Sequence, residues 1–430
     1  MYNVISLAGF FLFMAIAWGL STNRRIINWR VILWGILFQM IFALFLFLVP
    51  AGTKLFLVVN DVVIKILDSS AEGAKFVFGR LALPPGTTNK SGETSIGPIL
   101  AFQVFPTIIF FSALMSILYF FKIMPLFIRG FAYVFTKLMR ISGAESLNAV
   151  SNIFVGIESV FTIKPYLKDM TRSELFTLLT VCMSTVASNV MALYVFSLKG
   201  QFPTIAGHLV SASFLSAPAA LIISKLMMPE TETPKTLGVN VKPHYDREDN
   251  LFMAIINGAN SAIKFIVGIV ALLIAVIGLV ALIDLFLGWI GSFFNADITW
   301  SLKSFMGYLF YPFTLMTGVP LKDAGIVSQI IGERLIVTEV TAYVDLAEAV
   351  KQGLLSNPRS IIITSYALCG FAHISSMAIF IGGISALVPA KAGVIAKMGI
   401  KCLIAATIAC LMTACIAGLF YKESTILFEG

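Results

Sequence analysis

Long apolar runs separated by short polar segments dominate the chain from its first residues. A run of about 20 mostly apolar residues is long enough to cross the hydrocarbon core of a bilayer as a helix. Eight such runs are predicted, at residues 3–21, 31–50, 98–121, 174–198, 203–228, 258–294, 358–388 and 402–421. The pattern therefore predicts an all-α polytopic membrane protein with eight transmembrane helices.

Two further segments, 144–170 and 300–352, are too polar to face lipid, and each carries a central glutamate, Glu158 or Glu339. The basic loops between the apolar runs alternate correctly across the membrane only if each polar segment enters and leaves on the same side. We therefore predict two re-entrant helical hairpins from opposite faces. Irregular backbone at membrane depth must be covered by protein or line a cavity, and opposed pairs are typical of inverted-repeat transporters.

The remaining polar segments complete the predicted topology. The basic residues that follow the first run place that loop in the cytoplasm and the N-terminus outside, and the same rule places the C-terminus outside. Residues 51–97 contain an amphipathic stretch, and residues 122–143 suit a helix lying along the membrane interface. Residues 229–257 are expected to form a cytoplasmic linker.

Composition agrees with this pattern and excludes several classes of protein. Hydrophobic residues make up 58% of the 430 positions, charged residues only 12%, and the mean hydropathy is +0.94. These values exclude a soluble enzyme, a disordered chain and a disulfide-stabilised domain. The net charge of +8 does not indicate nucleic-acid binding, because the basic residues are dispersed among apolar segments. The five cysteines lie inside apolar segments without a metal-binding pattern, so we expect packing roles and no cofactor.

Four polar residues in apolar surroundings are candidates for binding a ligand. Burying an unpaired carboxylate in a membrane is costly, so Glu158 and Glu339 are predicted to accept hydrogen bonds from a polar ligand. The alternative for Glu158 is a structural pair with Lys164. His373 and Ser376 are three residues apart and share a helix face. Around Glu339, Tyr343 lies one turn further on, whereas Glu333 and Arg334 are expected near the outer end of the hairpin.

Asn152 and Thr185 supply oxygen atoms in the first half of the chain, and a hard cation such as Na⁺ prefers oxygen ligands. The alternative for Thr185 is a hydroxyl bonded to its own helix. The sequence contains no GxxxxGK[ST] or HExxH motif and no evident activated nucleophile with its base. We therefore expect neither an enzyme nor an ATP-driven pump, and active transport would draw on an ion gradient.

Four stretches resemble the concentrative nucleoside transporter family, whose bacterial-type members are nucleoside:cation symporters. Residues 102–112 (FQVFPTIIFFS) resemble its third-helix signature, and residues 142–146 and 151–156 resemble the entry of its first hairpin. Residues 338–343 (TEVTAY) are similar to the Asn-Glu-Phe-Val-Ala-Tyr of its second hairpin. Residues 369–376 (CGFAHISS) are similar to its Cys-Gly-Phe-Ala-Asn run ending in Ser-Ser, and order and spacing fit from about residue 1 to 422.

This resemblance implies a homotrimer in the bacterial inner (plasma) membrane, in which lipid surrounds a scaffold domain and an elevator-like transport domain. Scaffold helices would occupy residues 1–143 and 258–299, and the hairpins with their transport helices would occupy 144–228 and 300–422, before a tail at 423–430.

The resemblance also implies a role for each matching site residue. Glu158 would contact the nucleobase and Glu339 the ribose hydroxyls, while His373 stands where the family has a ribose-binding asparagine. The implied substrate site comprises Gly156, Ile157, Glu158, Thr338, Glu339, Phe371, His373 and Ser376. The implied sodium site comprises Asn152, Val155, Thr185 and Val186.

Three departures from the family pattern alter the predicted substrate site. The family's Gly-Gln-Thr-Glu is shortened to Gly156-Ile157-Glu158, and asparagines are replaced by Thr338 and His373. Ile157 cannot exchange hydrogen bonds with a base edge as glutamine does. A different small polar solute, and a sensor that no longer transports, therefore remain alternatives to a nucleoside. Sodium is favoured as the coupling ion, although His373 paired with Glu339 could carry a proton instead.

Overall fold

The computed structural model describes residues 1–422 other than 85, 90, 91, 98, 187, 246, 247 and 295–299. The predicted tail 423–430 lies outside the described residues. The first half contains α1 (Tyr2–Gly19), α2 (Trp29–Leu48), α3 (Pro50–Phe78), η1 (Gly79–Ala82), α4 (Leu100–Gln103), α5 (Phe105–Phe120), α6 (Ile123–Met139), α7 (Gly143–Val155), η2 (Gly156–Glu158), α8 (Ser159–Thr162), η3 (Lys164–Asp169), α9 (Arg172–Ser184), α10 (Ser188–Leu198) and α11 (Ile205–Met227). The second half contains α12 (Leu251–Gly291), α13 (Leu302–Met316), α14 (Leu321–Ile336), α15 (Glu339–Lys351), α16 (Pro358–Leu368), α17 (Ile374–Leu387), η4 (Pro389–Lys391) and α18 (Ala392–Phe420).

The order of elements repeats along the chain. An apolar helix (α5 or α12) is followed by a second helix (α6 or α13), a hairpin, an interrupted helix and a further apolar helix (α11 or α18). The predicted first hairpin corresponds to α7 to η3 and the second to α14 and α15, and their tips carry Glu158 and Glu339. The internal repeat inferred from the two polar segments therefore has a structural counterpart.

Local sequence signals set where these elements begin and end. Ser142 with Glu145, and Thr171 with Glu174, form capping boxes at the starts of α7 and α9. Gly156 ends α7 with a φ of 59°, a left-handed conformation that costs glycine little because it has no side chain. Each signal satisfies backbone groups that a helix end would otherwise leave without partners.

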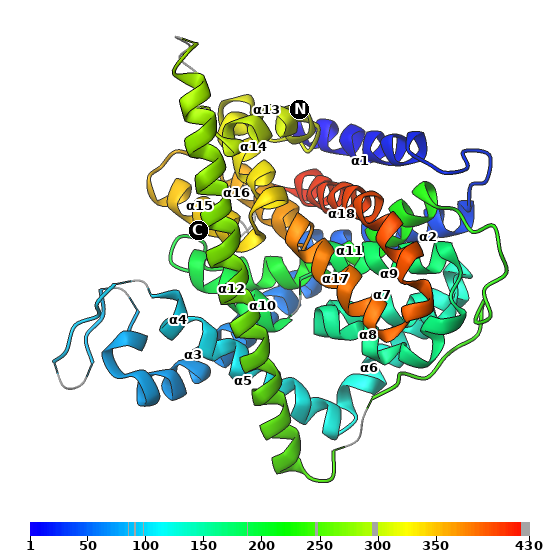
Figure 1. The fold of residues 1–430 in the computed structure, drawn as a ribbon, viewed down its shortest axis with the longest axis horizontal. Coiled ribbons are helices and arrows are strands. Elements are labelled where there is room, and N and C mark those ends of the chain that lie inside the picture. Colours follow the sequence, from blue (N-terminus) through cyan, green and yellow to red (C-terminus); the bar gives the residue numbers. More distant parts are fainter. Residues whose placement is uncertain are drawn as a thin grey trace.

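The centre of the molecule is formed by α11 and α18, whose side chains are buried along most of their length. Apolar residues all around a helix are typical of such a central position. In contrast, α12 runs along the outside of the packed body (Figure 1), and most of its apolar side chains are exposed. In a membrane, these side chains are expected to contact lipid or another subunit.

The structure corrects several predicted boundaries. Six described helices are long and apolar enough to cross a membrane. Two of the eight predicted spans, 174–198 and 358–388, are each interrupted, because α9 gives way to α10 and α16 to α17. The predicted hairpin 300–352 contains a separate helix, α13, before α14.

The long outer helix also begins earlier than predicted, at Leu251 rather than at residue 258. The side chain of Asn250 accepts a hydrogen bond from the Met253 N–H and so caps the helix there. The linker expected at 229–257 is correspondingly shorter.

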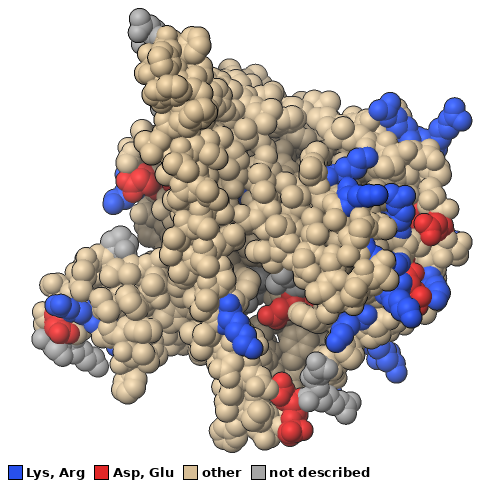
Figure 2. Space-filling view, viewed as in Figure 1, with Lys and Arg blue, Asp and Glu red and all other residues tan. Residues whose placement is uncertain are grey.

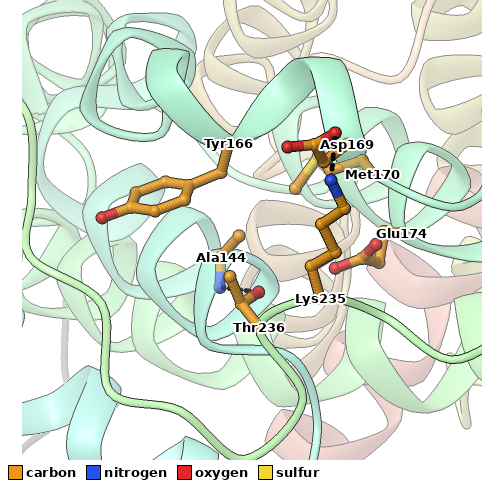
Figure 3. A pocket seen from close by; sticks show the side chains of 7 residues that line it. All are labelled: Ala144, Tyr166, Asp169, Met170, Glu174, Lys235 and Thr236. Atoms are coloured by element: carbon orange, nitrogen blue, oxygen red, sulfur yellow. Dashed lines mark hydrogen bonds and ion pairs between the residues drawn. The ribbon is translucent and has the colours of Figure 1, made fainter.

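This linker is attached to the base of the first hairpin. Thr236 accepts a hydrogen bond from the Ala144 N–H at 3.3 Å, and Lys235 pairs with Asp169 at 2.8 Å (Figure 3). These residues, with Tyr166 and Glu174 among others, surround a cavity of about 200 Å³. Lys and Arg gather on the same side of the molecule, where Figure 1 shows α7, α8 and α9 (Figure 2). The basic side therefore coincides with the end predicted to face the cytoplasm.

A buried ion pair connects the first hairpin to the end of α11. Lys225 Nζ lies 2.5 Å from Glu145 Oε1, and the two side chains are 4% and 1% exposed. Lys225 also donates to the Ser173 hydroxyl on α9 at 2.9 Å. Removing one partner of a buried pair leaves the other charge uncompensated.

We therefore expect Lys225→Met to lower the free energy of unfolding by about 3–5 kcal/mol. Thermal unfolding of the purified protein in detergent measures this as a fall in Tm. Lys75→Met is the control, because the Lys75–Glu72 pair is exposed and worth less than about 1 kcal/mol. Equal Tm shifts in the two variants would contradict the role assigned to Lys225.

Candidate functional site

Glu339 is the most buried acid of the predicted substrate site, with 2% of its surface exposed. It is the first residue of α15, and the hydroxyl of Tyr194 on α10 donates a hydrogen bond to its Oε1 at 2.8 Å. Tyr194 stacks on Tyr343, with ring centroids 4.3 Å apart. Tyr343, the neighbour that the sequence suggested, instead donates to the Ser365 carbonyl at 2.7 Å. Tyr194 was missed because it lies 145 residues away in the chain.

His373 and Ser376 lie at the start of α17, and His373 contacts Glu339. His373 Nε2 lies 2.9 Å from Glu339 Oε2. His373 Nδ1 accepts the Ser376 N–H at 3.2 Å, while the Ser376 hydroxyl and the His373 N–H lie 3.3 Å apart in the reciprocal contact. Two helices thus begin at the site, and the partial positive charge of their N-termini favours the nearby carboxylate.

A cavity of about 500 Å³ opens beside these residues. Thr338, Glu339, Phe371, His373 and Ser376 line it, so five of the eight predicted substrate residues meet in one place. Its remaining walls are almost entirely apolar and come from α10, α12, α15 and α17: Val190, Lys264, Phe265, Gly268, Ile269, Ala271, Leu272, Leu273, Val340, Ile379 and Phe380. Most buried small-molecule sites combine such apolar walls with a few convergent polar groups.

Among the described residues that line this cavity, Lys264 is the one lysine or arginine, and sequence reasoning did not single it out. It lies on α12. The sequence signal that could have identified Lys264 is its charge within a long apolar helix.

The tip of the first hairpin is not part of this cavity. Gly156 and Glu158 are absent from its described lining, and the side chain of Ile157 lies outside what the structure describes. Glu158 is exposed and forms no ion pair with Lys164 among the described residues. The structural alternative for Glu158 is therefore not observed.

Thr338 has a defined local role at the second hairpin. Its side chain accepts the Thr341 N–H and caps α15, as serine, threonine, asparagine and aspartate do at helix starts. In the family that the sequence resembles, an asparagine with its amide stands at this position, whereas here the side chain offers a hydroxyl. The residue therefore keeps the cap and has fewer groups to offer a ligand.

The four predicted sodium ligands are buried around the end of α7 and the break between α9 and α10. Asn152 Nδ2 and the Thr185 hydroxyl both donate to the Val181 carbonyl, at 2.7 and 3.4 Å. Because both side chains bond to the same carbonyl, the two residues predicted to supply oxygen ligands to the ion lie close together. Val155 is the last residue of α7, and Val186 lies in the break.

Two hydroxyls that sequence reasoning missed lie beside these residues. Ser159 donates to Asn152 Oδ1 at 3.4 Å, and Ser216 lies 3.0 Å from the Thr185 hydroxyl. The Thr185 hydroxyl is thus bonded both to its own helix, which was the structural alternative, and to α11. The neutral oxygens gathered here, together with the partial negative charge at helix C-termini, fit a monovalent cation.

Arg334 is fully buried rather than near the outer end of the hairpin. Its Nη1 donates to the carbonyl of Ala367, in the last turn of α16, while Nε and Nη2 have no hydrogen-bond partner among the described atoms. The positive charge of Arg334 compensates the partial negative charge of the carbonyl groups at the end of α16, where the interruption leaves them without intrahelical partners.

Three family profiles match successive parts of the chain. "Na+ dependent nucleoside transporter N-terminus" matches residues 8–81, "Nucleoside recognition" matches 101–201, and "Na+ dependent nucleoside transporter C-terminus" matches 208–418.

Among curated relatives, the nucleoside permease NupC of Helicobacter pylori is 36% identical over 98% of this chain and 97% of its own length. Solute carrier family 28 member 3 of Mus musculus is 35% identical over 97% of this chain. The chain spans only 59% of that mouse protein.

The fold also matches solved structures of CNTnw. An inward-facing substrate-bound state has a TM-score of 0.87, with 32% identity over 98% of both chains. A doubly substituted variant in an outward-facing state has a TM-score of 0.88, with 31% identity over 99% of both chains. These matches confirm the predicted helical membrane-transporter fold, without testing the count of eight spans.

The Tyr194–Glu339 contact generates a prediction about stability. Tyr194→Phe keeps the stacked ring but removes a hydrogen bond to a carboxylate, so the free energy of unfolding should fall by about 1.5–3 kcal/mol. The loss should be smaller in a Glu339→Gln background, because the amide oxygen is neutral. Thermal unfolding of the four proteins of this double-mutant cycle measures the coupling. An equal loss in both backgrounds would contradict a direct interaction.

Proposed function

The chain belongs to the Na⁺-dependent nucleoside transporter family, and we propose that it carries nucleosides across the membrane together with sodium. The observation that supports this best is the group formed by Glu339, His373 and Ser376. It is buried among the packed helices, lies where two helices begin, and opens into an otherwise apolar cavity. Nothing in this arrangement supplies an activated nucleophile, and the relatives are transporters rather than enzymes.

The two sides of the cavity suit the two parts of a nucleoside. Glu339 accepts hydrogen bonds from sugar hydroxyls, and the Nε2–H of His373 donates one. Phe371, Phe265 and Phe380 offer apolar surface to a planar base. Glu158 and the backbone at Gly156 would reach the base edge when the first hairpin closes on the substrate.

Sodium would bind at Asn152, Val155, Thr185 and Val186, where the side-chain oxygens of Asn152 and Thr185 are already gathered. Binding there would order the tip of the first hairpin, because Val155 directly precedes the turn at Gly156. Linkage then requires that substrate also tighten sodium binding. This coupling would make uptake depend on the sodium gradient.

The proposed movement is elevator-like. The transport domain would comprise residues 144–228 and 300–422, and it would slide against scaffold helices in 1–143 and 258–299. Residues 295–299 and 423–430 lie outside the described part of the chain. Similar agreement with inward-facing and outward-facing relatives supports one domain architecture that serves both states.

We further propose a homotrimer in the bacterial inner membrane, with both chain termini outside and no nucleic-acid partner. The exposed apolar length of α12 offers surface for subunit contacts and for lipid.

A second candidate is transport of another small polar solute on the same fold. The first hairpin has lost one residue and the amide that would read a base, and asparagine is replaced at Thr338 and His373. A site that lacks hydrogen-bonding groups cannot select the substrates that need them. A solute with hydroxyl groups and no base would still satisfy Glu339 and His373.

The central experiment reconstitutes the purified protein in liposomes and measures uptake of labelled uridine and adenosine. We expect uptake to require an inward sodium gradient and to be lost in Glu339→Gln, because the amide cannot accept as the carboxylate does. An inward proton gradient at matched voltage, without sodium, should not drive it. Absence of uptake of both nucleosides by folded protein would favour the second candidate or a sensor.

The sodium site generates a paired test at one position. Thr185→Val removes the oxygen, whereas Thr185→Ser keeps it at lower volume. The half-saturating sodium concentration should rise about tenfold in the valine variant, corresponding to about 1.4 kcal/mol of lost binding. It should stay within about twofold of the wild type in the serine variant. Equal sodium dependence in both variants would show that the hydroxyl does not bind the ion.

A further inference from the structure

The protonation state of His373 follows from its hydrogen bond to the backbone. A backbone N–H can only donate, and the Ser376 N–H points at His373 Nδ1 from 3.2 Å. Nδ1 must therefore carry a lone pair rather than a proton. Because neutral imidazole holds one proton, that proton lies on Nε2.

The other side of the ring faces the substrate cavity. Nε2 lies 2.9 Å from Glu339 Oε2, while the Tyr194 hydroxyl already donates to Oε1 of the same carboxylate. Apart from this contact with Nε2, Oε2 has no hydrogen-bond partner among the described atoms. His373 and Glu339 thus place one donor beside one available acceptor, which matches a hydroxyl that accepts from Nε2–H and donates to Oε2.

We propose that His373 works only as a neutral side chain, which caps α17 and donates to a substrate hydroxyl, and that its protonation closes the site. This inference rests on the proposed nucleoside function and specifies how its sugar-binding part is controlled. It makes His373 a specificity-determining and positioning residue rather than a carrier of the coupling proton.

Two consequences of protonation act in the same direction. If Nδ1 carried a proton, two hydrogen-bond donors, Nδ1–H and the Ser376 N–H, would face each other. The hydrogen bond between them would be lost, and with it the cap of α17. The resulting imidazolium would also hold Glu339 in an ion pair, so that the carboxylate no longer accepts from a substrate hydroxyl. Acid therefore weakens substrate binding.

The charged and titratable groups around the ring do not reverse the direction in which acid changes substrate binding. Glu339 on α15 faces it directly, Tyr194 on α10 donates to that carboxylate, and Lys264 on α12 lines the same cavity. None of them changes the direction of the effect, because protonation removes the Nδ1 acceptor whichever charges surround the ring.

Uptake kinetics test the proposal. The Michaelis constant for uridine is measured in liposomes at saturating sodium between pH 7.5 and 5.5. We expect it to rise as the pH falls in the wild type, because protonation of the ring removes the neutral side chain that caps α17 and binds the substrate hydroxyl. His373→Asn should hold it within about twofold, because asparagine also caps helices and donates but does not titrate in this range.

His244→Asn is the matched control, since His244 lies in the linker, and it should keep the wild-type profile. An acid-induced rise of the Michaelis constant that persists in His373→Asn would overturn the proposal, as would a Michaelis constant that falls in acid.

The tautomer can be read without transport. The chain has three histidines, so ¹⁵N-histidine spectra of the purified protein contain few imidazole signals, and His373→Asn identifies one of them. We expect the His373 signal at pH 7.5 to show an unprotonated Nδ1 and a protonated Nε2. A protonated Nδ1 at that pH would overturn the proposal even if uptake is normal. Failure of the wild type to transport any nucleoside would instead overturn the proposed function and leave the tautomer assignment standing.

Discussion

The two interrupted helices, α9–α10 and α16–α17, pack against each other, and backbone groups left open at such breaks have no water to bind within a membrane. The break between α16 and α17 packs directly against the break between α9 and α10. A Cβ atom at Gly370 would lie 2.9 Å from the Ser184 carbonyl oxygen and 2.6 Å from Cys410 Sγ, so only glycine allows this approach. The rest of the site depends on how the chain satisfies the backbone groups at the helix ends that are gathered here.

The helix ends at the site carry partial charges of opposite sign, and each end is matched by side chains of a different kind. The N-terminal ends of α15 and α17 carry partial positive charge, and Glu339 lies there with Thr338 and His373 as caps. The C-terminal ends of α7 and α9 carry partial negative charge, and Asn152 and Thr185 gather there. An acceptor for hydroxyl groups and a site for a cation thus arise from the same backbone geometry, in different halves of the repeat.

The sequence predicted those features that depend on local pattern. Apolar runs located the long apolar helices, six of which are long enough to cross a membrane, and the isolated acids lie at the tips of the two hairpins. The breaks were not located by hydropathy, because the residues within them are themselves largely apolar. Tyr194, Lys264 and the buried position of Arg334 were missed because each depends on contacts between distant segments. The resemblance to a family supplied the roles of residues that periodicity alone could not distinguish.

The two halves of the repeat neutralise their helix C-termini by different means. In the second half, Arg334 extends from α14 to the Ala367 carbonyl at the end of α16 and brings a permanent positive charge. In the first half, Asn152 extends from α7 to the Val181 carbonyl near the end of α9, and its amide is neutral. A neutral side chain leaves the partial negative charge of that end available to a soluble cation, whereas a guanidinium occupies it. The proposed sodium site therefore belongs to the first half alone, and its counterpart in the second half is a cation that the chain supplies itself.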